Sequence, residues 1–122
     1  MRFSLTSLCL LFSGLAAAQD TQPFVGTWKV SWQGERGITE ARLVIEASGG
    51  SWQTLARKKA DPCQGLKVPI VLQDIEADSV TVYAKFGETL GGCQDAHIKL
   101  RKTDADHMVG TRGEKEVRAV RD

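Results

Sequence analysis

Apolar and polar residues alternate along most of the chain after Pro23. A period of two is typical of strands that bury one face, and no stretch shows the 3.6-residue period of an amphipathic helix. Short clusters of Gly, Asp, Ser and Ala interrupt the alternation at the places where turns are needed. The pattern predicts eight strands, at residues 24–33, 38–46, 51–58, 67–75, 79–86, 96–103, 107–112 and 115–121.

The predicted strands can be tested against one another, because residues directly opposite in an antiparallel pair share a face of the sheet. With Trp28 on the inner face, the first turn pairs it with Leu43, and the second turn is expected to pair Leu43 with Thr54 and Ile45 with Trp52. Carried through five turns, this choice gives an almost wholly apolar inner set, as a wrong register would not. The inner set is Trp28, Val30, Trp32, Leu43, Ile45, Trp52, Val68, Ile70, Leu72, Val80, Val82, Ile98, Leu100, Met108, Val117 and Ala119.

Eight short antiparallel strands joined mostly by tight turns predict an all-β fold, an eight-stranded antiparallel up-and-down β-barrel. Such a barrel closes on itself and leaves no free sheet edge. Connections that follow alternate strands lie at the same end of it. The two longer connections, around Cys63 and Cys93, follow the third and fifth predicted strands, so both are expected at one rim.

The first residues follow a different pattern from the rest. Arg2 precedes an apolar run from Phe3 to Leu15, and three alanines follow at 16–18. This order is typical of a secretion signal, and the run is shorter than the roughly 20 residues that a membrane-spanning helix needs. Residues 1–18 are therefore expected to be a signal peptide, cleaved from a single domain at 19–122 in a secreted or periplasmic protein.

Cleavage would leave two cysteines in an oxidising compartment, which predicts one disulfide between Cys63 and Cys93. Their wide spacing and the lack of neighbouring ligands argue against a redox CxxC site or a zinc site. The charges are balanced, with 16 Lys and Arg against 15 Asp and Glu. An even mixture without a basic face argues against nucleic acid as a partner, and no basic amphipathic helix suggests a membrane surface after signal cleavage.

The segment Phe24-Val25-Gly26-Thr27-Trp28, together with Arg121 near the end of the last strand, resembles the structural signature of the calycin superfamily. That group includes lipocalins, fatty-acid-binding proteins, avidins and small bacterial inhibitors. The chain also resembles bacterial secreted proteins of unknown function. The resemblance implies that Trp28 lies in the barrel floor with Arg121 across it. Phe24 and Gly26 complete this barrel-closing set.

Histidines would be the obvious catalytic or metal-binding residues, and neither is well placed for that role. His97 and His107 are predicted on the outer face, roughly 20 Å apart along their hairpin. Neither has a serine or cysteine nucleophile beside it, and no carboxylate pair points inward for acid–base chemistry. The sequence therefore predicts no enzyme, no metal site and no cofactor.

The rim that carries the two long connections is the expected binding site. One hypothesis is a binding protein that holds a small apolar molecule there, with Trp32 as a wall, although core packing is the favoured role for Trp32 itself. The alternative is a periplasmic inhibitor of a protease or lysozyme, acting through residues 19–23 or the 87–95 loop. A hollow interior would favour the first and a filled one the second. The candidate rim residues are Trp32, Arg36, Gln64, Thr89, Leu90 and Gln94.

Overall fold

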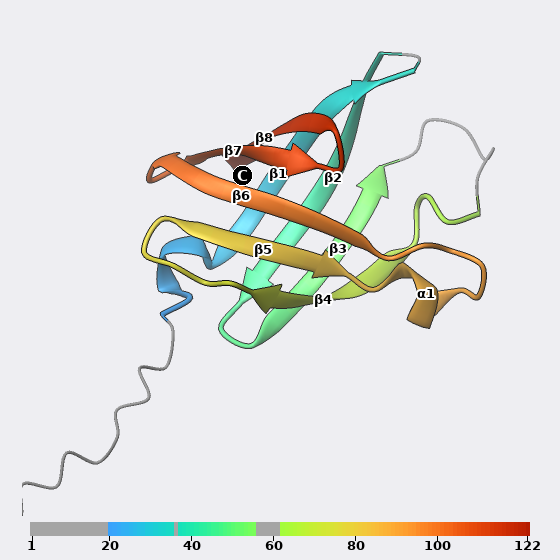
Figure 1. Ribbon diagram of the computed structural model, residues 1–122, viewed down its shortest axis with the longest axis horizontal. Coiled ribbons are helices and arrows are strands. Elements are labelled where there is room, and N and C mark those ends of the chain that lie inside the picture. Colours follow the sequence, from blue (N-terminus) through green and yellow to red (C-terminus); the bar gives the residue numbers. More distant parts are fainter. Residues whose placement is uncertain (1–19, 36, 56–61) are drawn as a thin grey trace, which may run out of the picture.

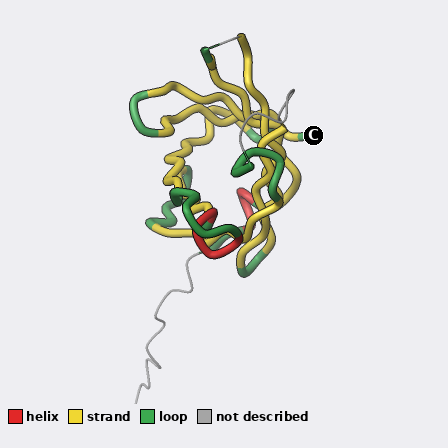
Figure 2. Tube along the Cα trace, turned by 90° about the vertical axis from the view of Figure 1, so that its right-hand side faces the viewer, coloured by secondary structure: helices red, strands yellow, loops and turns green. Residues whose placement is uncertain are grey.

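The computed structural model describes residues 20–35, 37–55 and 62–122, and they form a closed barrel of eight antiparallel strands (Figure 1). Each strand pairs with the next, and the last pairs back to the first, so that the strands make a ring when the barrel is viewed from its end (Figure 2). The strands are β1 (Gly26–Gly34), β2 (Gly37–Glu46), β3 (Gly49–Leu55), β4 (Lys67–Gln73), β5 (Ser79–Ala84), β6 (Ala96–Asp104), β7 (His107–Arg112) and β8 (Lys115–Arg121).

The predicted fold class is confirmed, including the disulfide between Cys63 and Cys93. Two short helices accompany the strands: η1 (Gln22–Phe24) precedes β1, and α1 (Phe86–Thr89) follows β5. The predicted signal peptide at 1–18 lies outside the described residues. Within the three described ranges, no helix is long and apolar enough to cross a bilayer.

The register of the first hairpin is the predicted one, with Trp28 opposite Leu43. In the second hairpin the predicted partners are wrong, because Leu43 lies opposite Trp52 and not Thr54. The reason is a shorter turn: β3 already begins at Gly49, so its two glycines pair with the end of β2 instead of forming the turn. The shift is two residues, and the inner and outer faces are therefore unchanged.

The fifth strand is shorter than predicted. It ends at Ala84, and Phe86 begins α1 with its side chain buried in the core. The alternating pattern predicts that Phe86 ends the strand, whereas in the structure its buried side chain anchors the connection that follows.

The turn between β6 and β7 also differs. The predicted strand ends at residue 103, whereas β6 continues to Asp104, which lies opposite His107, and the register shifts between Lys102 and Asp104. The Asp104 carboxylate accepts a hydrogen bond from the Asp106 backbone N–H at 2.8 Å. This side-chain turn takes one extra residue into the β6 strand, as a β-bulge does.

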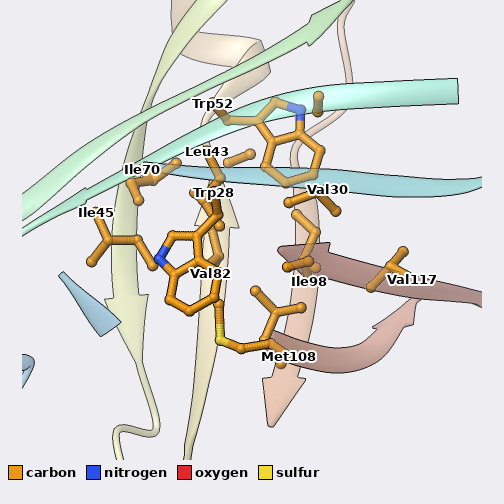
Figure 3. Packing of buried hydrophobic residues seen from close by; sticks show 14 of the residues in the cluster. Trp28, Val30, Leu43, Ile45, Trp52, Ile70, Val82, Ile98, Met108 and Val117 are labelled. Carbon is orange, nitrogen blue, oxygen red and sulfur yellow. The ribbon is translucent and has the colours of Figure 1, made fainter. Parts of the chain in front are cut away.

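The barrel interior is filled by side chains from every strand (Figure 3). All members of the predicted inner set are buried except Leu72, which is half-buried against the cluster. Trp28 and Trp52 are completely buried. A core of this composition supplies most of the free energy of folding, at about 25 cal/mol for each Å² of apolar surface buried.

A close approach between the backbones of β6 and β7 depends on a glycine in β7. A Cβ atom on Gly110 would collide with the backbone carbonyl of Lys99 on the neighbouring β6. Glycine inside a strand often marks such a close approach of another backbone. Any side chain at position 110 would therefore force the main chain of β6 or β7 to move.

Candidate functional site

One end of the barrel is closed by η1 and by the side chain of Arg121. The Arg121 guanidinium lies 4.3 Å from the centre of the Trp28 ring and donates hydrogen bonds to the carbonyls of Val25 at 2.7 Å and Ala105 at 3.0 Å. The indole N–H of Trp28 in turn donates to the Phe24 carbonyl at 2.8 Å. Stacking and charged hydrogen bonds together hold the segment before β1 and the end of β8 against the floor.

Gly26 completes this arrangement. Its φ is +141°, and a Cβ atom there would lie 2.5 Å from Nη1 of Arg121. The structure thus brings Phe24, Gly26, Trp28 and Arg121 into one cluster at the floor.

The residues just before β1 lie fixed on the same floor. The Pro23 carbonyl accepts hydrogen bonds from Lys102 Nζ at 2.9 Å and from Arg121 Nη2 at 3.3 Å. The hydroxyl of Thr21 donates to the Ala47 carbonyl at 3.2 Å. The described part of the predicted 19–23 inhibitory segment is therefore attached to the barrel from Thr21 onward.

The opposite rim carries the connection between β5 and β6, residues 85–95, which we call the β5–β6 loop (Figure 1). Phe86 anchors its start in the core, and Cys93 joins its end to Cys63. Between them, the Leu90 N–H donates to the Phe86 carbonyl at 3.0 Å, and the Cys93 N–H donates to the Leu90 carbonyl at 3.1 Å. The Leu90 side chain is nevertheless 38% exposed.

Asp95 attaches the loop to the outer face of the sheet. Its carboxylate accepts the Gly87 backbone N–H at 2.8 Å and the Tyr83 hydroxyl at 3.0 Å. The Gly87 hydrogen bond holds the pKa of Asp95 below its ordinary value of 3.8. The same carboxylate raises the pKa of Tyr83, because it favours the protonated phenol.

Tyr83 is itself in contact with two further side chains. Its ring packs edge-on against the His97 ring at 4.1 Å, and Lys85 Nζ lies 4.3 Å from the ring centre. Sequence reasoning missed this cluster. The available signal was that Tyr83 and His97 both fall on the outer face of adjacent strands, but the role of Asp95 depends on a backbone N–H eight residues away.

His97 and His107 both point to the outside, as predicted, and each contacts one side chain. His97 packs on Tyr83, and Nδ1 of His107 lies 2.8 Å from an Asp104 carboxylate oxygen. The His107 hydrogen bond lowers the pKa of Asp104. Among the described residues, no group of three His, Cys, Asp or Glu side chains is close enough to hold a metal ion.

Trp32 faces the interior near the rim and is only 6% exposed. It stacks on Trp52 with ring centres 6.0 Å apart, and the guanidinium of Arg112 lies 5.0 Å from its ring. Burial in this position lowers the pKa of Arg112. A ligand at the rim would have to compete with both neighbours for the Trp32 ring.

The other predicted rim residues fall into two groups. Arg36 lies outside the described residues. Gln64, Thr89, Leu90 and Gln94 are exposed, and the disulfide brings the first of these beside the β5–β6 loop, since Gln64 follows Cys63 directly. Their role in binding stays a prediction.

No family model matches the chain, and no curated protein matches its sequence. Among solved structures, a redesigned β-barrel is similar, with a TM-score of 0.51 and 12% sequence identity over 85% of this chain and 96% of that chain. Similarity at this level of identity concerns the fold alone. It agrees with the strand count and closure described above, and places the chain among small closed β-barrels.

Proposed function

We propose that this protein is a non-enzymatic binding protein that recognises a partner protein through the β5–β6 loop, with Leu90 as its apolar contact. The observation that carries the proposal is that the loop is exposed and yet held at several points. These are the buried Phe86, the Cys93 disulfide and the two hydrogen bonds of Asp95. A loop that is already ordered loses little conformational entropy on binding, which favours affinity.

The alternative contact segment before β1 is supported less well. A segment that enters an enzyme cleft must leave the surface of its own protein. The backbone at Pro23 is bound by two cationic side chains, and Phe24 is completely buried. The Pro23 backbone and the Phe24 side chain would both have to be released before the described part of the 19–23 segment could enter a partner's cleft.

The backbone hydrogen bonds of Leu90 limit which of its groups can contact a partner protein. Its N–H and its carbonyl are both bonded within the loop, so the backbone is not available to pair with a protease in the manner of a substrate. The side chain is the accessible group. We therefore favour a partner with an apolar pocket or patch that receives Leu90, such as a secreted enzyme, over substrate-like inhibition.

Binding of a small apolar molecule at the rim has weaker support than binding of a partner protein by the β5–β6 loop. The inner face is occupied by a continuous buried cluster, and the Trp32 ring already contacts both Trp52 and Arg112.

The proposal includes two further assignments, the location of the protein and its superfamily. The disulfide suits a secreted or periplasmic location, and the contact of Arg121 with Trp28 supports a calycin-like barrel.

The proposal can be tested with two matched variants, since Leu90 and Leu55 are exposed to similar extents, 38% and 44%. Wild-type protein, Leu90→Asp and Leu55→Asp would each be immobilised and exposed to the secreted or periplasmic fraction of the source. We expect a partner that is retained by the wild type and by Leu55→Asp and lost with Leu90→Asp. Identical retention by all three proteins would contradict the proposal. So would native mass spectrometry showing a bound small molecule and no protein partner.

A further inference from the structure

A groove of about 530 Å³ lies on the outer face of the barrel, away from the β5–β6 loop contacts described above. Three adjacent strands place Thr81, Lys99 and Thr111 side by side at its centre, in register on β5, β6 and β7. Arg101 lies two residues beyond Lys99 on the same face of β6, and Glu116 borders the groove on β8. The volume falls in the range of pockets that bind small molecules.

The floor of the groove contains an unusual polar group. Thr81 belongs to the outer face of β5, yet it is only 7% exposed. Its hydroxyl makes no hydrogen bond to another group in residues 20–35, 37–55 or 62–122. A buried hydroxyl without a hydrogen-bond partner is costly. The Thr81 hydroxyl therefore indicates a ligand or a water molecule that forms a hydrogen bond with it.

Charged side chains of both signs line the groove. Lys99 lies opposite Thr81, and Arg101 lies opposite Ser79, next to the connection between β4 and β5 that carries Asp74 and Glu76. In the described part of the chain, ion pairs form between other residues, and none joins these four. Asp74 also has a φ of +48°, a left-handed conformation that Asp tolerates better than most residues.

We propose that this groove binds a short peptide with free termini. Its carboxylate pairs with Lys99 and Arg101 and accepts a hydrogen bond from Thr81, and its ammonium group pairs with Asp74 and Glu76. Charges of both signs in one groove complement a zwitterion better than a simple anion or cation. The carboxylate of Glu116 on the far side would repel a polyanion such as a nucleic acid.

The test is a titration of isotopically labelled protein, followed by amide NMR shifts, with trialanine, N-acetyl-trialanine and trialanine amide. We expect trialanine to shift the amides of β5, β6 and β7 around Thr81, Lys99 and Thr111. Each capped peptide should bind at least tenfold more weakly, because it lacks one charge. Equal affinity for all three peptides, or shifts confined to another surface, would overturn the proposal.

A double variant tests the binding of the peptide carboxylate by Lys99 and Arg101. The double variant Lys99→Gln/Arg101→Gln should weaken trialanine at least tenfold while leaving the already weak binding of trialanine amide unchanged. Lys29→Gln is the matched control, since Lys29 is an exposed outer-face lysine that pairs with Glu40 on other strands. An equal loss in this control would contradict the assignment. The NMR spectra themselves report whether each variant is folded, and Leu90→Asp should bind trialanine normally, because the groove is independent of the proposed partner site.

Discussion

Arg121 lies across the indole ring of Trp28, with 4.3 Å between its guanidinium carbon and the ring centre, and the two residues are also register partners in the pairing that closes the barrel. The same guanidinium reaches the carbonyls of Pro23, Val25 and Ala105. One side chain thus connects the segment before β1, the last strand and the turn between β6 and β7.

Replacement of Arg121 should therefore lower the stability of the barrel. We expect Arg121→Ala to reduce the free energy of unfolding by about 2–3 kcal/mol, since it removes a cation–π contact and several charged hydrogen bonds. Arg121→Lys should recover only part of the loss, because an ammonium group cannot reach all three carbonyls in one plane. Urea unfolding followed by tryptophan fluorescence measures both. Arg118→Ala, an exposed position on the same strand, serves as the control and should change stability little.

A methyl group at position 110 should be much more damaging than one at position 91. Gly110→Ala would drive Cβ into the Lys99 carbonyl, and we expect a loss of about 3 kcal/mol or more in the free energy of unfolding. Gly91→Ala is the matched control, since nothing lies within 4 Å of its Cβ position. Thermal unfolding of the two variants compares them directly. Equal stability would show that β6 and β7 can separate at this point without cost.

Loss of the disulfide should destabilise the domain without unfolding it under native conditions. The Cys63–Cys93 bond joins residues 30 apart in sequence, and a crosslink over such a loop contributes about 2–4 kcal/mol, mainly by restricting the unfolded chain. The paired variant Cys63→Ser/Cys93→Ser should show this loss in urea unfolding. The wild type with reductant should give the same midpoint. Different midpoints would mean that the serine side chains themselves disturb the rim.

The attachment of the β5–β6 loop by Asp95 should weaken in acid. The folded protein lowers the pKa of this carboxyl from 3.8, so its contribution to stability is complete above that value and is lost as the pH falls through the lower folded pKa. Asp95→Asn should thus be less stable than the wild type at neutral pH, and the difference should shrink and then vanish as the pH falls below 3.8. Exchange of the Gly87 amide hydrogen with solvent should accelerate over the same interval. A difference between the proteins that is independent of pH would contradict this account.

Much of the fold was predictable because the alternation of apolar and polar residues along a strand shows which side chains face inward and which face outward. The lengths of the turns were harder to predict from the sequence. Gly49 was read as turn because glycine is common there, whereas it pairs with Glu46 inside the hairpin. The error did not affect the predicted core, since a shift of two residues leaves every side chain on its own face.

The candidate sites were predicted unevenly for a similar reason. The positions of Leu90 and Gln64 at one rim follow from strand alternation and the cysteine pair. The bonds from Asp95 to Tyr83 and Gly87, in contrast, depend on how the chain turns after β5, and the sequence contains no periodic signal for this. The groove was not predicted at all, because residues on four strands line it and alternation shows only that they face outward.

Closure of the barrel has a consequence for how the protein folds. Seven of the strand pairings join neighbours in sequence, but the eighth links β1 to β8, and Arg121 bonds to a carbonyl 96 residues away. A contact of such long range forms slowly. Until it forms, β1 and β8 both present unpaired edges that can join other chains. Aggregation during refolding should therefore rise steeply with protein concentration, and changes that delay the meeting of β1 and β8 should increase it even when the finished barrel is stable.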